Sequence, residues 1–127
     1  MKKILVVEDD PINLQILSDF LGAHGYDMRG AANGPDGVAS FWRERPDLML
    51  IDVQLPRKNG FEVCWEIKRT PEGAQMPVLL MSAVYPPHDV LDRHAAPSLA
   101  AGYLAKPFDL EGLLSRVRTL IGDAATA

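Results

Sequence analysis

Short apolar runs alternate along this chain with segments whose apolar residues have helical spacing. This alternation predicts a parallel sheet, because each strand must return to the same edge through a helix. The runs expected as strands are Lys3–Val7, Tyr26–Ala31, Asp47–Asp52, Pro77–Met81 and Ala101–Ala105. Right-handed connections and short loops then favour a doubly wound five-stranded α/β fold with strand order 2-1-3-4-5. The second run is the most polar, so we expect it at an edge.

About five helices are expected around this sheet. Four of them are predicted at Pro11–His24, Pro35–Glu44, Phe61–Arg69 and after Asp109. Asp10 is expected to cap the first helix, with Pro11 at its first position. The apolar stripe of that helix is expected to consist of Ile12, Ile16, Leu17, Phe20 and Leu21. The remaining helix, at Asp89–Ala96, should be short because prolines surround it.

The composition is that of one soluble globular domain. A chain of 127 residues with 47% apolar residues is near the common size of a single domain. The net charge of −4 and the lack of Lys or Arg clusters argue against a nucleic-acid partner. A lone cysteine, Cys64, and an apolar start that Glu8 interrupts too early for a signal peptide favour a cytoplasmic protein. We expect one domain at residues 1–122 and a tail at 123–127.

Charged and polar side chains follow four of the predicted strands. The first strand is followed by Glu8 and Asp9, the third ends at Asp52, the fourth is followed by Ser82 and the fifth by Lys106. Ligands of doubly wound sheets bind beyond the carboxyl ends of the strands, so these side chains should share one edge. Singly, each could be a helix cap, a turn residue or a surface charge. Their joint placement favours a functional site.

The chemistry of this group points to a metal ion and a phosphoryl group. Carboxylates from neighbouring strands repel one another unless a proton or cation lies between them, and their oxygens suit Mg²⁺. Asp52 beside that ion could attack phosphorus and form an acyl phosphate. Lys106 and Ser82 would then hold phosphoryl oxygens. Such a transfer needs positioning and charge neutralisation without a separate base.

Five ordered motifs resemble the receiver domain of the response regulators of two-component signalling. The resemblance extends from Lys3 to about Gly122. Its motifs are Ile4-Leu5-Val6-Val7-Glu8-Asp9-Asp10-Pro11, Asp47-Leu48-Met49-Leu50-Ile51-Asp52, Pro56 and Gly60 at four and eight residues after Asp52, Pro77-Val78-Leu79-Leu80-Met81-Ser82-Ala83, and Tyr103-Leu104-Ala105-Lys106-Pro107-Phe108. No single motif is specific, but five at these separations would rarely arise by chance.

The resemblance implies roles for individual residues. Asp52 is implied as the phosphoacceptor, with Ser82 and Lys106 as its hydroxyl and lysine partners. The implied Mg²⁺ ligands are Glu8, Asp9, Asp52 and the backbone carbonyl of Gln54. Ser82 and Tyr103 are implied as a switch, in which the ring turns inward after the hydroxyl moves toward phosphate.

The resemblance also implies partners. A phosphohistidine on a sensor histidine kinase or a histidine phosphotransfer protein would donate the phosphoryl group. The chain would be a signalling switch, not an enzyme, because it catalyses only its own phosphorylation and dephosphorylation. A downstream protein would bind the face of the fourth helix, fifth strand and fifth helix, since no output domain is expected after residue 122. Neither nucleic acid nor membrane is an expected partner.

The sequence departs from the family pattern between Ser82 and Lys106. This stretch looks about two residues longer than usual, Leu99 stands where Gly is usual, and three prolines occur in it. Val84 is apolar where many relatives have a polar residue near the attacking water, which predicts slow self-dephosphorylation. These departures leave open a pseudo-receiver that binds a protein without phosphorylation. A flavodoxin-like flavin-binding protein is a second alternative, although its phosphate would favour a Ser, Thr or Gly-rich loop after the first strand.

Overall fold

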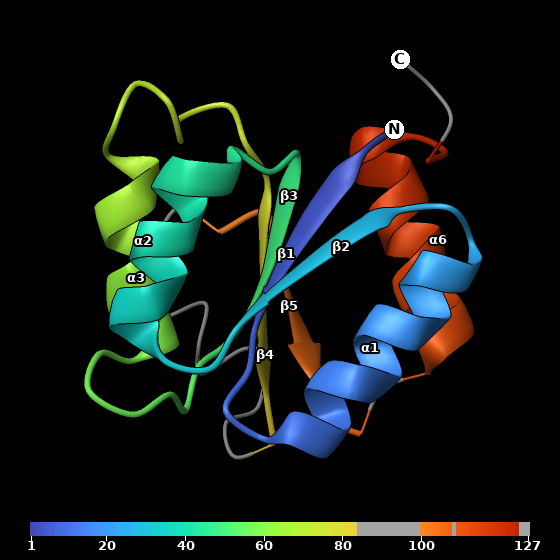
Figure 1. The fold of residues 1–127 in the computed structure, drawn as a ribbon, viewed down its shortest axis with the longest axis horizontal. Helices are drawn as coiled ribbons and strands as arrows, with labels where there is room; N and C mark the ends of the chain where they lie inside the picture. Colours follow the sequence, from blue (N-terminus) through green and yellow to red (C-terminus); the bar gives the residue numbers. More distant parts are fainter. Residues whose placement is uncertain (84–99, 108, 125–127) are drawn as a thin grey trace.

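The computed structural model describes residues 1–83, 100–107 and 109–124. Its centre is a sheet of five parallel strands in the order β2-β1-β3-β4-β5 (Figure 1). The strands are β1 Lys3–Val7, β2 Asp27–Ala31, β3 Leu48–Asp52, β4 Val78–Ser82 and β5 Gly102–Ala105. The predicted doubly wound topology is confirmed, and each strand begins within one residue of its predicted position.

Two layers of helices cover the sheet. The described helices are α1 Pro11–Ala23, α2 Gly34–Glu44, α3 Gly60–Lys68 and α6 Leu110–Ile121. Figure 1 shows α2 and α3 on one face of the sheet and α1 and α6 on the other. The helix predicted at Asp89–Ala96 lies outside the described residues. None of the described helices is both long and apolar enough to span a bilayer.

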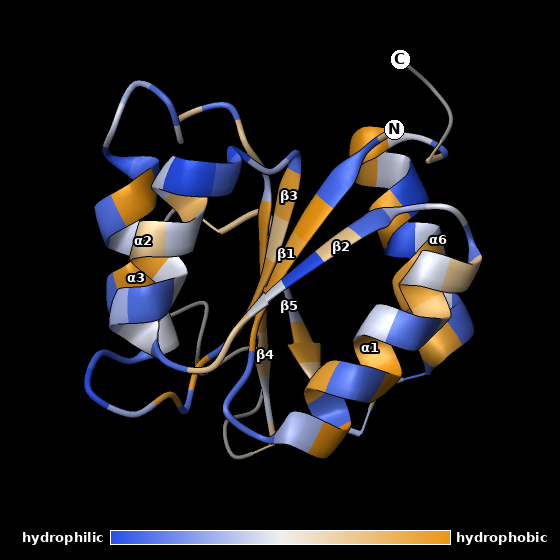
Figure 2. Cartoon of the chain, in the orientation of Figure 1, coloured by the Kyte–Doolittle hydropathy of each residue, from blue (hydrophilic) through white to orange (hydrophobic). Residues whose placement is uncertain are grey.

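The three central strands are buried on both faces. Every residue of β3 and β4 is buried, as is β1 after Lys3, and these strands form the most apolar part of the cartoon in Figure 2. Such continuous burial is expected where helices cover both faces of a parallel sheet. The more polar β2 lies at an edge and is partly exposed, as predicted.

Side-chain caps fix where the helices begin. The Asp10 carboxylate accepts a hydrogen bond from the backbone N–H of Ile12 at 3.0 Å, and Pro11 follows as the first helical residue. Asn59 caps α3 and forms a reciprocal capping box with Glu62. Each cap provides a partner for a backbone N–H that the first helical turn leaves unpaired.

The predicted apolar stripe of α1 is partly wrong. Leu17 and Leu21 are buried, but Ile12 is 69% exposed and Ile16 is 46% exposed. Only a narrow stripe of α1 that includes Leu17 and Leu21 faces the core, and the neighbouring row that includes Ile12 and Ile16 lies outside it. Two apolar side chains are therefore left on the surface near the end of the sheet where α1 begins.

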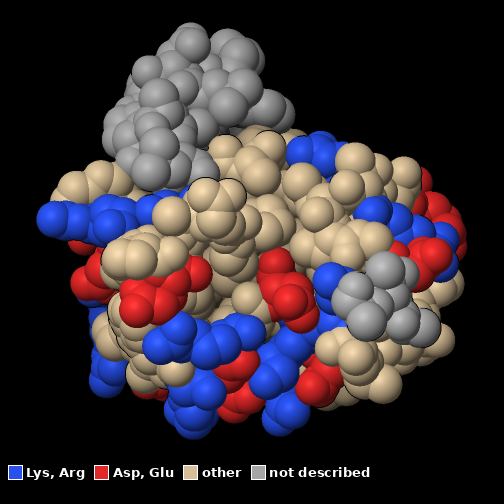
Figure 3. Space-filling model, turned by 90° about the horizontal axis from the view of Figure 1, so that it is seen from above, with Lys and Arg blue, Asp and Glu red and all other residues tan. Residues whose placement is uncertain are grey.

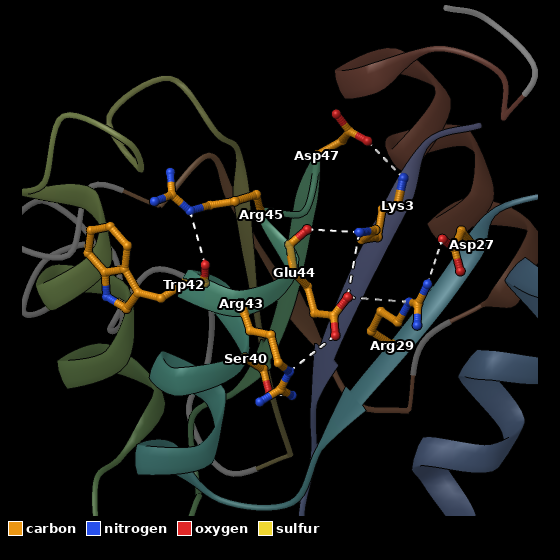
Figure 4. Close-up of polar contacts among 9 residues, drawn as sticks. All are labelled: Lys3, Asp27, Arg29, Ser40, Trp42, Arg43, Glu44, Arg45 and Asp47. Atoms are coloured by element: carbon orange, nitrogen blue, oxygen red, sulfur yellow. Dashed lines mark hydrogen bonds and ion pairs between the residues drawn. The ribbon is translucent and has the colours of Figure 1, made fainter.

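Ion pairs connect the opposite end of the sheet. Figure 4 shows Lys3 of β1, Arg29 of β2 and Arg43 of α2 converging on Glu44, at 3.5, 3.7 and 3.2 Å. Figure 3 looks down on this end, where Lys and Arg are interspersed with Asp and Glu. Exposed pairs contribute little stability individually, so this network supplements the apolar core.

Candidate active site

Three carboxylates meet at the carboxyl ends of β1 and β3. One oxygen from each of Glu8, Asp9 and Asp52 lies within 4.8 Å of the others. Glu8 and Asp52 are buried and Asp9 is exposed, so the group is open to solvent on one side. The ligands of an octahedral Mg²⁺ are about 3.0 Å apart when adjacent and about 4.2 Å when opposite, so these hard oxygens suit that ion in kind and would close in around it.

Lys106 adds one positive charge to this acidic group. It follows β5, and its Nζ donates hydrogen bonds to Glu8 Oε1 at 2.7 Å and to Asp52 Oδ2 at 2.9 Å. A single ammonium therefore bridges two buried carboxylates from different strands. With Asp9 included, the site keeps an excess of negative charge, as a site for a divalent cation requires.

Burial and hydrogen bonding shift the pKa values of the bridged groups. Burial raises the pKa of Glu8 to about 7, and the hydrogen bond from Lys106 opposes this rise. Burial lowers the pKa of Lys106, but its hydrogen bonds to Glu8 and Asp52 outweigh that effect and leave the pKa above its ordinary value. Lys106 is therefore a permanent cation at neutral pH.

Backbone groups orient the two buried carboxylates. The backbone N–H of Gln54 donates to Asp52 Oδ1 at 2.9 Å, and that of Asp10 donates to Glu8 Oε2 at 3.2 Å. One oxygen of Asp52 therefore accepts a hydrogen bond from the loop after β3, and the other accepts one from Lys106. These contacts hold the carboxylate in a single orientation at the end of β3.

Ser82 and Tyr103 lie together next to this group. Ser82 ends β4 and is buried, and it pairs in register with Ala105, the residue before Lys106. Tyr103 is also buried, and its hydroxyl donates to the backbone carbonyl of Ser82 at 3.4 Å. This distance is long for a hydroxyl donor, so the bond is weak. The structure brings together all the side chains predicted for the site.

A hollow of about 430 Å³ borders the carboxylates on the side of α1. It runs between α1 and the segment after β5, and its lining includes Glu8, Asn13, Ile16, Lys106 and Leu110. Sequence reasoning missed Asn13 and Ile16 as neighbours of the site. The four-residue spacing of Ile12 and Ile16 predicts burial, so it gives no sign that Ile16 borders the site.

Residues 4–118 match the family model of the response regulator receiver domain. The chain belongs to this family. The DNA-binding dual master transcriptional regulator RpaA of Synechocystis is 38% identical over 121 residues, which cover 95% of this chain and 49% of that protein. The response regulator MprA of Mycobacterium leprae is 37% identical over 94% of this chain and 50% of its own length. The receiver chain thus spans about half the length of these curated relatives.

Solved receiver structures share the fold. One is the receiver domain of sensor histidine kinase PA1611 from Pseudomonas aeruginosa, which has a magnesium ion coordinated in its active site cleft. It is 30% identical to this chain with a TM-score of 0.85, and the match covers 96% of this chain and 98% of that one. The chemotaxis response regulator CheY4 of Vibrio cholerae is 28% identical with a TM-score of 0.87, over 94% and 98%. Receiver domains are signalling switches of two-component systems, so the expected family, fold and signalling class are confirmed.

Proposed function

We propose that this receiver domain accepts a phosphoryl group on Asp52 in a Mg²⁺-dependent reaction. The observation that carries the proposal is the joint position of Glu8, Asp9, Asp52 and Lys106 at one end of the sheet. Lys106 pairs with two of these carboxylates, and the third leaves unbalanced negative charge, which costs stability. Such a cost is expected where charge serves binding or chemistry.

Glu8, Asp9, Asp52 and the backbone carbonyl of Gln54 would hold the metal ion. When bound, Mg²⁺ would neutralise charge that develops on the transferred phosphoryl oxygens. The donor set consists of hard oxygen ligands, which suit Mg²⁺ better than softer transition metals. The magnesium in the PA1611 receiver domain supports the same assignment here.

The phosphoryl transfer would use the ionised carboxylate of Asp52 as nucleophile. One of its oxygens forms a bond to phosphorus while the phosphorus–nitrogen bond of a phosphohistidine breaks and the histidine keeps the electron pair. Lys106 would then hold a phosphoryl oxygen with its ammonium, and Ser82 would hold another with its hydroxyl. No separate base is needed, because Asp52 carries no proton to remove.

Ser82 and Tyr103 would couple the phosphorylated state to a partner. Tyr103 already lies inward and close to the Ser82 backbone. Movement of the Ser82 hydroxyl toward phosphate would change the packing around this ring. A downstream protein would read the change on the face formed by β5, α6 and the segment between β4 and β5, of which residues 84–99 lie outside the described part.

The phosphoryl donor would approach over the start of α1. Ile12 and Ile16 are exposed there, and Ile16 lines the hollow that leads to Glu8 and Lys106. Exposed apolar side chains beside a reactive group suit a protein partner better than a small donor. This partner would be a sensor histidine kinase or a histidine phosphotransfer protein.

Intact mass after incubation with a small phosphodonor tests the proposal. A gain of one phosphoryl group is expected with Mg²⁺, and no gain is expected without Mg²⁺ or in Asp52→Ala. Absence of any gain in the natural chain would favour the pseudo-receiver, which binds its partner without phosphorylation. A gain that persists in Asp52→Ala would place the chemistry on another residue.

A further inference from the structure

The loop between β3 and α3, residues 53–59, borders the metal site. It begins directly after Asp52 and includes Gln54, whose N–H holds Asp52 Oδ1. Its two ends are tied together, because the N–H of Gly60 donates to the Val53 carbonyl at 2.9 Å. A Cβ at Gly60 would lie 2.3 Å from the Asp52 carbonyl oxygen, so the loop returns against the end of β3. A shift of this loop would therefore reach Asp52.

The outer part of the loop rests on α2. Gly34, the first residue of α2, is buried, and a Cβ there would lie 2.1 Å from the Lys58 carbonyl oxygen and 2.6 Å from Lys58 Cβ. The nearest atoms all belong to Lys58, and two of them are backbone atoms that cannot rotate away. Only a residue without a side chain allows this approach.

The start of α2 is itself well fixed. The Asn33 side chain caps the helix by accepting from the N–H of Asp36 at 2.8 Å, and its amide donates to the Asp36 carboxylate at 3.0 Å. A Cβ at Gly37, one turn further along, would lie 3.0 Å from both Cγ atoms of Val7, so α2 lies close to the last residue of β1. The first turn of α2 thus provides a firm surface for Lys58.

A second contact on the loop is weaker. Lys58 Nζ pairs with Glu66 of α3 at 3.0 Å, but the two side chains are 30% and 43% exposed. Exposed pairs of this kind contribute little to the position of a backbone segment. The close packing of Gly34 on the Lys58 backbone is therefore the stronger constraint.

We propose that Gly34 is a positioning residue for the metal site, because it holds loop 53–59 against Asp52. It touches neither metal nor phosphate and acts through Lys58 and the loop. This inference rests on the proposed function, since it concerns the Mg²⁺ that Asp52 and Gln54 would bind. A methyl group at position 34 would push the loop outward and weaken Mg²⁺ binding.

Titration of the full chain with MgCl₂, followed by amide resonances in NMR spectra, tests this inference. We expect Gly34→Ala to bind Mg²⁺ about tenfold more weakly, at the lower end of losses caused by removing a group that orients a metal ligand. Amides of residues 53–59 should exchange with solvent faster in this variant. Glu66→Gln should change the affinity less than twofold, because the pair is exposed.

Two glycine variants serve as matched controls. Gly73→Ala introduces a clash of the same kind, 2.2 Å from the Ile67 carbonyl oxygen, in the loop that precedes β4. That loop lies at the other end of the sheet, so Mg²⁺ affinity should stay unchanged even if the variant is less stable. Gly22→Ala has only Met28 Cγ nearby, at 3.7 Å, and should alter neither property.

The outcomes separate this inference from the proposed function. Equal Mg²⁺ affinity in Gly34→Ala and the natural chain, or an equal loss in Gly73→Ala, would overturn the positioning role alone. No Mg²⁺ binding by the natural chain would overturn the proposed function and this inference with it. If Gly34→Ala does not fold, Asn33→Ala decides, because it loosens the same turn without adding atoms. It should bind roughly threefold more weakly, and unchanged binding would refute the role.

Discussion

In the absence of metal, the substitution Asp52→Asn is expected to stabilise the fold. Asp52 is buried with its oxygen within 4.8 Å of oxygens of Glu8 and Asp9, and its only cationic partner among the described residues is Lys106 at 2.9 Å. Asparagine keeps the shape of the side chain and removes its charge. The substitution thus removes the repulsions from Glu8 and Asp9 and the attraction to Lys106.

The size of the expected gain in the free energy of unfolding follows from these distances. At an effective dielectric constant of about 20, two carboxylates at 4.8 Å repel by about 3.5 kcal/mol, and the pair with Lys106 at 2.9 Å attracts by about 6 kcal/mol. The repulsion from exposed Asp9 is weaker. Asparagine loses one of two hydrogen bonds, at a cost of about 1 kcal/mol, but avoids the several kcal/mol needed to bury a charge. The net gain is about 1 to 2 kcal/mol, or a rise in Tm of about 4 to 8 °C.

Urea and thermal unfolding in EDTA at pH 8 measure this gain. Lys106→Met is the matched control with opposite sign, because it leaves two buried carboxylates without an ammonium and should cost about 3 to 5 kcal/mol. Mg²⁺ should raise the Tm of the natural chain more than that of Asp52→Asn. A less stable Asp52→Asn, or a Lys106→Met as stable as the natural chain, would refute the electrostatic reasoning.

Three further predictions concern pH, phosphoryl lifetime and the donor. The pKa of Glu8 is raised from 4.5 to about 7 in the folded chain. The stability contributed by its protonated form is therefore complete below about pH 4.5 and is lost as pH rises through 7. Urea midpoints measured in EDTA should fall between pH 5.5 and pH 8, and the fall should be smaller in Glu8→Gln. Val84→Glu should shorten the acyl-phosphate half-life, and a natural half-life shorter than that of the variant would contradict the sequence interpretation. Ile16→Lys should slow transfer from a phosphohistidine protein but not from a small phosphodonor, and equal slowing of both would show damage to the site itself.

The sequence predicted the sheet and the acidic site because both depend on local patterns. Apolar runs that must be buried on both faces define β1, β3 and β4, and polar residues at their ends mark the edge where ligands bind. The positions of Glu8, Asp52 and Lys106 follow from this geometry alone. The start of α1 was predicted correctly because Asp10 is a strong cap followed by Pro11. The starts of α2 and α3, which Asn33 and Asn59 cap, were predicted one residue late.

Features that depend on packing between distant segments could not be predicted. The contact of Gly34 with Lys58 joins the start of α2 to the loop before α3, and no local pattern indicates it. The exposure of Ile12 and Ile16 depends on how α1 is rotated on the sheet, which helical spacing alone does not determine. The inward position of Tyr103 likewise depends on the packing around Ser82. The predictions for Val84 and for the helix at Asp89–Ala96 concern residues outside the described part.

The most direct test of the central claim is to locate the phosphoryl group on the chain. An acyl phosphate formed in Mg²⁺ and a small phosphodonor can be reduced with borohydride, and the modified residue can then be identified by peptide mass mapping. We predict reduction at Asp52 alone, with none in chelator. Modification at Glu8 or Asp9, or no modified peptide at all, would contradict the assignment of Asp52 as the phosphoacceptor.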